Sequence, residues 1–169
     1  MKPFNVLFLC TGNSARSIMA EACLNSAGQG RLVAYSAGSR PQGAVNRFAL
    51  DLLTRRGIDT GRLRSKGWDE FARPGAPAMD FVLTVCDHAA GEVCPVWPGR
   101  PITAHWGVDD PARVEGDDAR KRRAFARAYD ALSARIDRLL ALPLENLARA
   151  EIASRLAEIG RHPVDAHRT

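Results

Sequence analysis

The stretch at residues 4–17 restricts the fold of this chain more than any other. An almost continuous apolar run, FNVLFLC, ends at Cys10 and leads directly into the polar stretch TGNSARS. Such a run is typical of a strand buried on both faces of a parallel sheet. The small residues after it predict a tight loop, and the residues from 18 to 27 predict a helix closed by glycine. The stretch therefore indicates a strand–loop–helix unit with a cysteine at the end of its strand.

Strand and helix patterns alternate along the rest of the chain. Strands are predicted at 32–37, 80–86 and 101–105, and helices at 46–56, 117–140 and 145–159. The stretch 59–78 is rich in glycine and proline, which predicts loop or short helix. Alternating elements of this kind indicate an α/β fold: a single-domain, doubly wound sheet of about four parallel strands flanked by helices.

Charge and composition narrow the classes of partner. The 169 residues carry a formal net charge of +5, which suits an anionic partner. The basic run at 120–123 has no interleaved aromatic residues and no nucleic-acid motif around it, so it predicts the solvated face of a helix and no nucleic-acid binding. No segment approaches the roughly 18 apolar residues of a membrane span. With four cysteines, too sparse for a secreted disulfide scaffold, we expect a cytoplasmic protein with no membrane partner.

The loop after Cys10 has the chemistry of an anion site. A loop between a strand and a helix directs backbone N–H groups inward, and the helix N-terminus adds positive potential. Gly12 is expected to let the backbone turn tightly, and the planar fork of Arg16 can hold two oxygens of an oxyanion. The same field would lower the pKa of the Cys10 thiol. The alternative is a buried structural cysteine followed by a chance arginine, but the strand and helix around the loop favour the functional interpretation.

These residues carry a family resemblance. VLFLCTGNSARS at 6–17, SAG at 36–38 and the dipeptide at Asp110 and Pro111 resemble the low-molecular-weight protein tyrosine phosphatase superfamily, and within it the arsenate reductases built on that fold. The resemblance covers roughly residues 4–140. It implies that residues 1–142 form the catalytic domain and that residues 143–169 form a C-terminal helical extension and tail.

The resemblance also implies roles for single residues. Cys10 would be the nucleophile, Arg16 the oxyanion clamp and Asp110 the general acid. Asn13 would stiffen the loop through hydrogen bonds, and Ser17 would stabilise the thiolate. The residues expected to surround the oxyanion are Thr11, Gly12, Asn13, Ser14, Ala15, Arg16 and Ser17.

Asp110 is also a reasonable acid on chemical grounds. Protonation of a leaving group needs an acid held above the nucleophile, and a carboxylate fixed by a following proline can serve. Asp109 is the adjacent rival, and an ordinary Asp-Pro turn is the alternative without a catalytic role. Ala112 stands where tyrosine phosphatases usually carry an aromatic residue, which disfavours a phosphatase.

Two further cysteines distinguish a reductase from a phosphatase. Cys86 and Cys94 lie in the stretch CDHAAGEVC. In the resembled reductases a second cysteine attacks the sulfur of the nucleophile and releases arsenite. A third cysteine then resolves that disulfide and passes it to thioredoxin, a role the resemblance gives to Cys94. The spacing of seven intervening residues is one more than in the best-described thioredoxin-coupled enzymes.

The leading hypothesis is therefore an arsenate reductase that takes electrons from an external thiol by disulfide exchange. Its partners would be arsenate or phosphate and a donor such as thioredoxin, glutaredoxin or a low-molecular-weight thiol. We expect no bound cofactor and a monomer or weak homodimer. The alternatives are a phosphatase that hydrolyses phosphotyrosine or small phosphate esters, and a non-catalytic oxyanion-binding module.

Metal sites receive less support. Cys86, Cys94 and either His88 or His105 fit no common zinc spacing. Asn13, Glu21 and Ser36 would hold potassium as in some relatives, or would be ordinary polar residues. Cys23, in the middle of a predicted helix, is expected in the core. The last helix is expected to pack Leu144, Ala148, Ile152 and Leu156 against its own domain, with a dimer contact as the alternative.

Overall fold

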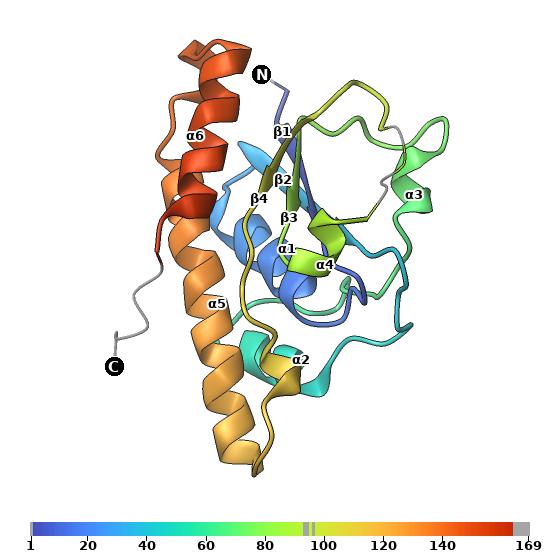
Figure 1. The fold of residues 1–169 in the computed structure, drawn as a ribbon, viewed down its shortest axis with the longest axis vertical. Coiled ribbons are helices and arrows are strands. Elements are labelled where there is room, and N and C mark those ends of the chain that lie inside the picture. The colour runs from blue at the N-terminus through green and yellow to red at the C-terminus, as the bar shows by residue number, and fades with distance from the viewer. Residues whose placement is uncertain (1, 93–94, 96, 164–169) are drawn as a thin grey trace.

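A four-stranded parallel sheet lies at the centre of the structure (Figure 1). The structure is a computed structural model, and it describes residues 2–92, 95 and 97–163. The strands are β1 (Phe4–Leu9), β2 (Leu32–Ala37), β3 (Phe81–Thr84) and β4 (Ile102–His105). The helices are α1 (Arg16–Ala27), α2 (Arg47–Arg55), α3 (Asp69–Ala72), α4 (Asp87–Ala90), α5 (Asp118–Leu140) and α6 (Arg149–Arg161), with 3₁₀ turns η1 (Pro111–Arg113) and η2 (Leu144–Asn146).

The strand order brings the two predicted reactive thiols together. The order is β2-β1-β3-β4, so the direction of winding reverses between β1 and β3. Leu9 pairs with Thr84, and the N–H of Val85 donates to Leu9 O. Cys10 and Cys86 therefore leave the carboxyl ends of adjacent strands, at the reversal point where ligands bind in open α/β sheets.

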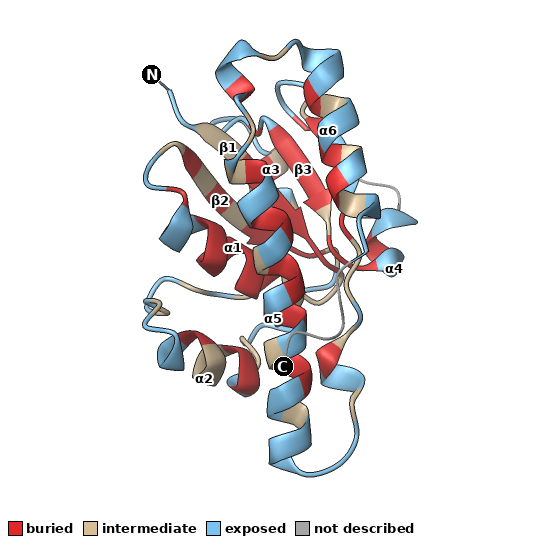
Figure 2. Cartoon of the chain, turned by 90° about the vertical axis from the view of Figure 1, so that its left-hand side faces the viewer, coloured by how far each residue is buried: buried red, intermediate tan, exposed pale blue. Residues whose placement is uncertain are grey.

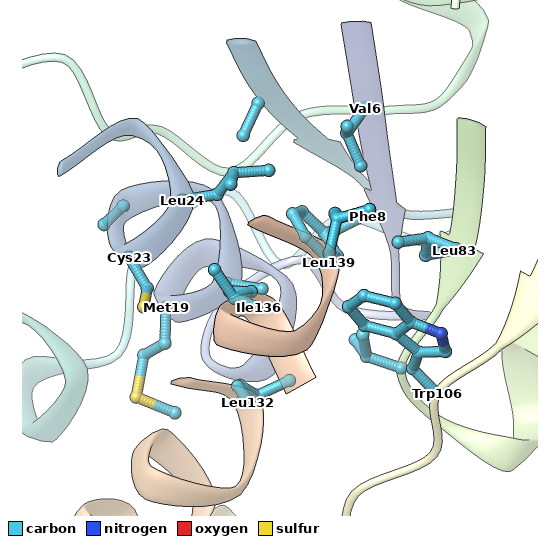
Figure 3. Packing of buried hydrophobic residues seen from close by; sticks show 14 of the residues in the cluster. Val6, Phe8, Met19, Cys23, Leu24, Leu83, Trp106, Leu132, Ile136 and Leu139 are labelled. Carbon is cyan, nitrogen blue, oxygen red and sulfur yellow. The ribbon is translucent and has the colours of Figure 1, made fainter. Parts of the chain in front are cut away.

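Side chains of the strands alternate between two apolar layers. Val6, Phe8 and Leu83 face the layer formed with α1, α2, α5 and α6, and Figure 3 shows this packing around Trp106. Leu7 and Leu9 face a smaller layer. Its other members are Tyr35, Ala37, Trp68, Phe71, Ala72, Met79, Val82 and Trp97. Figure 2 shows the buried sheet and the division of α5 into a buried and an exposed side.

The predicted parallel α/β fold is confirmed, and the differences lie at element ends. β3 ends at Thr84 rather than at residue 86, and the unpredicted α4 begins directly after Cys86, whose sulfur accepts a hydrogen bond from Ala89 N–H. The last helix begins at Arg149 rather than at residue 145, because the chain after Pro143 first forms η2. In the described ranges, no helix is long and apolar enough to cross a membrane.

The last helix packs on its own domain. Ile152, Leu156 and Ile159 are buried, and Trp106 Nε1 donates to Leu156 O across 2.9 Å. The expectation for Ala148 is wrong: it is exposed, because it precedes the helix as its N-cap residue. Leu144, in η2, is buried as expected.

Gly160 allows α6 to approach β4 closely. A Cβ at this position would lie 2.1 Å from His105 O and 2.9 Å from the Trp106 ring. We therefore expect Gly160→Ala to destabilise the protein by about 1–3 kcal/mol through overpacking, although the same change stabilises an exposed helix by about 1 kcal/mol. Chemical denaturation measures the change, and Ser154→Ala on the exposed side of α6 is the control. An unchanged or higher stability in Gly160→Ala would contradict this packing.

Candidate active site

The loop after β1 turns its carbonyl groups away from its centre. Three of them accept hydrogen bonds from backbone N–H groups of residues 40–46. The pairs are Arg40 N to Thr11 O at 2.9 Å, Gln42 N to Gly12 O at 3.0 Å and Asn46 N to Ser14 O at 2.8 Å. With the carbonyls held outward, the loop's N–H groups are left to face an anion.

Asn13 is the internal brace of this loop. Its side chain is fully buried and makes three hydrogen bonds: Nδ2 donates to Ser17 Oγ (2.8 Å) and Ser36 Oγ (3.0 Å), and Oδ1 accepts from Lys66 N (2.9 Å). Asn13 also has a φ of 42°, a left-handed conformation that asparagine tolerates. The chain bends at Gly12, as expected, and the left-handed residue of the loop is Asn13, which directly follows it.

Gly38 lets the segment after β2 lie against the loop. A Cβ there would be 2.4 Å from Thr11 O and 2.6 Å from Cys10 O. Only glycine fits at that distance from two backbone oxygens. This close approach explains the SAG sequence, whose serine, Ser36, bonds to Asn13.

Arg16 and Asp110 meet beside the loop. Arg16 is the first residue of α1, and the preceding Ala15 offers no side-chain cap, so the first-turn amides stay available to a ligand. Arg16 Nη2 lies 3.4 Å from Asp110 Oδ2, and Nη1 donates to Val108 O at 2.9 Å. In the free protein the guanidinium fork is therefore occupied by the loop that carries the predicted acid.

Asp110 forms the predicted turn and also faces the site, while its role as an acid stays a prediction. Its Oδ1 accepts a hydrogen bond from Ala112 N–H at 3.0 Å and so caps η1, which is the turn function. Its Oδ2 faces Arg16. The rival Asp109 is exposed. Of the two carboxylates, the geometry therefore brings Asp110 to the site.

The thiols of Cys10 and Cys86 lie close enough for each to shift the pKa of the other. Both are buried, and both are free thiols. Cys86 Sγ also accepts from Ala89 N–H at 3.4 Å and lies 3.7 Å from Thr11 Oγ1. Cys86 is thus held beside Cys10 by contacts with the loop and with α4.

One negative charge is favourable in this pair and two are not. The hydrogen bond from Cys10, assisted by Ala89 N–H and Thr11, lowers the pKa of Cys86 to about 5. The same hydrogen bond and burial raise the pKa of Cys10, and the Arg16 charge only partly opposes them. Arg16 and the Thr11 N–H lower the pKa of Cys10, as expected of the loop, but in the free protein the contact with Cys86 and burial outweigh them.

The remaining cysteines have different outcomes. Cys94 lies outside the described residues, so its role stays a prediction. Cys23 is buried in the main core, as expected. Among the residues that the structure describes, no group of three or more His, Cys, Asp or Glu side chains is placed to hold a metal ion.

Glu92 is a site residue that the sequence pattern did not indicate. Its Oε1 accepts hydrogen bonds from Thr11 Oγ1 (3.2 Å) and Ser39 Oγ (2.8 Å), and it lies 3.7 Å from His88 Nε2. These contacts tie the segment after Cys86 to the nucleophile loop. An isolated glutamate in a short polar stretch carries no periodicity from which this position could be predicted.

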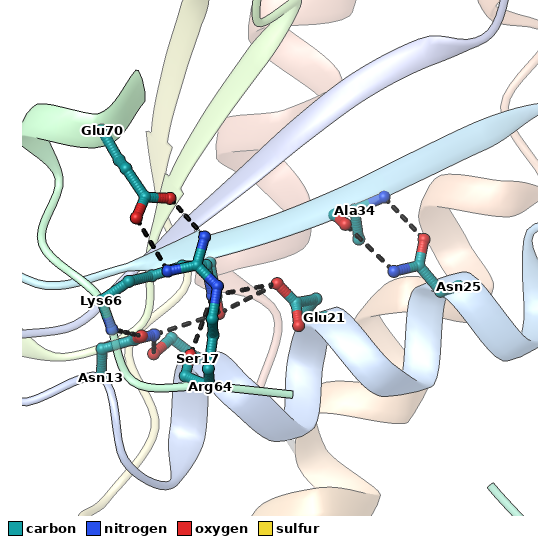
Figure 4. A network of polar contacts seen from close by, with 9 residues as sticks. Asn13, Ser17, Glu21, Asn25, Ala34, Arg64, Lys66 and Glu70 are labelled. Carbon is teal, nitrogen blue, oxygen red and sulfur yellow. Dashed lines mark hydrogen bonds and ion pairs between the residues drawn. The ribbon is translucent and has the colours of Figure 1, made fainter. Parts of the chain in front are cut away.

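Lys66 occupies the place considered for potassium (Figure 4). Its Nζ lies 3.5 Å from Glu21 Oε1 and 3.3 Å from Ser36 Oγ, and it donates to Arg64 O at 3.0 Å. Both Lys66 and Glu21 are buried. Burial lowers the pKa of Lys66 and raises that of Glu21, and the mutual attraction opposes both shifts. Glu21 and Ser36 therefore do not fit potassium here, since an ammonium group already contacts their oxygens.

Comparison with known proteins identifies the chain's relatives. The model of the family described as low molecular weight phosphotyrosine protein phosphatase matches residues 5–153. The chain is 40% identical over 131 residues to an arsenate reductase of Halalkalibacterium halodurans, covering 78% of this chain and 91% of that protein. It is 37% identical over 138 residues to an arsenate reductase of Bacillus licheniformis, covering 82% and 96%.

Solved structures agree in fold. A low molecular weight protein tyrosine phosphatase from T. tengcongensis superposes with a TM-score of 0.65 at 26% identity, covering 85% of this chain and 99% of that one. An arsenate reductase from Archaeoglobus fulgidus gives 0.58 at 29% identity, covering 78% and 98%. The chain is thus similar in fold both to a protein named as a phosphatase and to one named as an arsenate reductase.

The shared charge of the thiol pair predicts a specific titration. On a Cys94→Ser background, the thiolate absorbance of the pair should be present at neutral pH and should disappear as the pH falls through about 5. Cys10→Ala, unlike Cys10→Ser, removes the group that donates to Cys86, so its midpoint should rise toward the ordinary cysteine value. A midpoint near 8.5 in the parent and unchanged in Cys10→Ala would show that no charge is shared.

The Lys66 contacts predict potassium independence. We expect Lys66→Ala to lose about 3–5 kcal/mol of stability, because Glu21 would be buried without its cation. Potassium chloride, compared with equal sodium chloride, should restore part of this loss in Lys66→Ala and leave the wild type unchanged. Thermal unfolding measures both, with Lys121→Ala as the control. A wild type that needs potassium for full stability would contradict the assignment.

Proposed function

Because the chain belongs to the low molecular weight phosphotyrosine protein phosphatase family, and because a second thiol is paired with its nucleophile, we propose that it is an arsenate reductase. The pair of Cys10 and Cys86 carries this proposal. Hydrolysis of a phosphate ester needs one nucleophilic thiol, whereas reduction of arsenate needs a second thiol to supply electrons. The relatives reported above that carry the name arsenate reductase support the same activity.

The first step is attack by the Cys10 sulfur on arsenic. A sulfur–arsenic bond forms, and an arsenic–oxygen bond breaks. The departing group is a hydroxyl of arsenate; Asp110 takes up a proton once Arg16 leaves it for the oxyanion, and gives that proton to the hydroxyl, which leaves as water. The inward amides of the loop and the Arg16 fork hold the remaining oxygens. As the oxyanion binds, Arg16 gives up its contacts with Asp110 and Val108 O and contacts the oxyanion instead.

The charge of the thiol pair must reside on Cys10 for this attack. In the free protein, the contact between the two sulfurs lowers the pKa of Cys86 and raises that of Cys10, so the proton of the pair is favoured on Cys10. Transfer of that proton to Cys86 produces the nucleophile next to the oxyanion. Cys86 is therefore protonated during the first step and must lose the proton again before the second.

The second step is attack by Cys86 on the Cys10 sulfur. A disulfide forms, the sulfur–arsenic bond breaks, and its electron pair stays on arsenic. Arsenic(V) is thereby reduced to arsenic(III), and the two thiols are oxidised. The disulfide is returned to thiols by exchange with an external dithiol; we propose Cys94 as the resolving thiol and thioredoxin or glutaredoxin as the donor. This chemistry requires a reducing compartment, which supports a cytoplasmic location.

The second candidate function is hydrolysis of phosphate esters. The nucleophile, the clamp and the acid suffice for it, and the solved phosphatase shares the fold. Ala112 follows the Asp-Pro dipeptide and is exposed, so it offers no aromatic ring to a phosphotyrosine. We therefore expect slow hydrolysis of aryl phosphates as a side reaction of the same site.

Cys86→Ser separates the two reactions. We expect it to abolish multiple-turnover arsenate reduction, because nothing displaces the Cys10 adduct, and to keep aryl phosphate hydrolysis within about tenfold of the wild-type rate. Reductase activity is measured as arsenate-dependent NADPH oxidation with a thioredoxin system, and separately with glutaredoxin.

Cys23→Ser is the matched control, since it replaces a buried cysteine of α1 whose polar neighbours, Tyr129 and Ser133, belong to α5, and it should leave both reactions intact. Wild-type rates of arsenate reduction by Cys86→Ser, with the same donor, would overturn the relay. If Cys10→Ser loses both reactions while Cys86→Ser keeps both, Cys10 is still the nucleophile. Direct attack of the donor thiol on the Cys10–arsenic adduct would then be the better account.

A further inference from the structure

Arg135 of α5 is a buried cation that the reaction steps above do not use. The residue is 7% exposed, and its Nη1 donates to Gly107 O at 2.8 Å. Its Nε is buried and has no hydrogen-bond partner in the described part of the chain. Burial lowers the pKa of the guanidinium, and within residues 2–92, 95 and 97–163 no neighbouring carboxylate opposes that shift. Arg135 thus differs from Lys66, whose charge is matched by Glu21.

A buried guanidinium without an acidic partner costs stability. Replacement of buried charges by apolar side chains of similar size is often neutral or stabilising. The fold of α5 therefore does not require an arginine at this position. A role in the site is the better explanation, because the group that Arg135 holds is close to Asp110.

Arg135 and Arg16 hold neighbouring carbonyl groups of one segment. Arg135 binds Gly107 O from α5, and Arg16 binds Val108 O from α1. Asp110 follows two residues later. A cavity of about 750 Å³ lies between α5 and this segment, with Gly107, Asp110 and Arg135 in its lining. Open space rather than packed side chains thus borders the segment here, so the two guanidinium contacts restrain it.

We propose that Arg135 is a positioning residue for Asp110, which keeps the acid-bearing segment in place when Arg16 turns to the oxyanion. On binding, Val108 O loses its bond from Arg16, while Gly107 O keeps its bond from Arg135. Asp110 then stays where it can give its proton to the departing oxygen. The inference rests on the role of Asp110 under the proposed function.

Hydrolysis of aryl phosphates with different phenols tests this role. A sulfur–phosphorus bond forms, the phosphorus–oxygen bond to the phenol breaks, and the acid protonates that oxygen. A weakly acidic phenol needs the proton, and a nitrophenol leaves without it. We expect Arg135→Met to lower kcat for phenyl phosphate by roughly tenfold or more, part of the 10²–10⁴-fold effect of a general acid. The rate for dinitrophenyl phosphate and the KM of both should change little.

Three further variants complete the test. Asp110→Asn should also lose more kcat with phenyl phosphate than with dinitrophenyl phosphate, and this difference should be larger than in Arg135→Met. Arg138→Met, an exposed arginine one turn along α5 that borders the same cavity, should show none. Arg135→Lys keeps a donor for Gly107 O and should recover part of the phenyl phosphate rate. The melting temperature of Arg135→Met should equal or exceed that of the wild type.

The outcomes separate the inference from the proposed function. If Asp110→Asn loses more rate with phenyl phosphate than with dinitrophenyl phosphate, Asp110 is the general acid. If Arg135→Met then slows both substrates equally, or slows neither, the positioning role of Arg135 is wrong. If Asp110→Asn loses equal rate with both aryl phosphates, Asp110 is not the general acid, and the positioning role of Arg135 fails with that assignment. If Arg135→Met does not fold, Arg135 is structural, unless Arg135→Lys folds and loses rate selectively with phenyl phosphate, which would support the proposal.

Discussion

The buried amide of Asn13 is the constraint on which the site depends. Its hydrogen bonds join the loop to α1 through Ser17, to β2 through Ser36 and to the chain at Lys66. A loop of small residues has high conformational entropy, and an array of convergent N–H groups is unfavourable without an anion. The three bonds fix the loop before substrate arrives, so binding does not have to order it.

The same brace links the loop to an internal ion pair. Lys66 provides a backbone N–H to Asn13 and a side-chain ammonium to Glu21 and Ser36. Loop conformation and charge balance behind the loop therefore depend on one short segment. The segment is held in turn by Arg64, which makes a bidentate contact with Glu70 of α3.

The sequence allowed the prediction of those parts that are local. Cys10, Arg16 and the strand before them lie within one strand–loop–helix unit, and the apolar runs of β1 and β3 indicate a sheet that brings Cys86 beside Cys10. Lys66, Glu92 and Arg135 could not be predicted, because the contacts that bring them to the site, with Glu21, Thr11 and Gly107, span 28 or more residues of the chain. The sign of the Cys10 pKa shift was also inaccessible, since it depends on the hydrogen bond with Cys86 rather than on the loop alone.

The contact between Arg16 and Asp110 has a consequence for which anions the site admits. A ligand does not enter a vacant cationic site; it must displace a carboxylate that is already there. Singly charged, weakly basic anions such as chloride or nitrate gain too little from the guanidinium to replace it. A tetrahedral oxyanion with several charged oxygens gains more, because it also engages the loop amides. Selectivity against the abundant simple anions of the cell thus arises from competition within the protein itself.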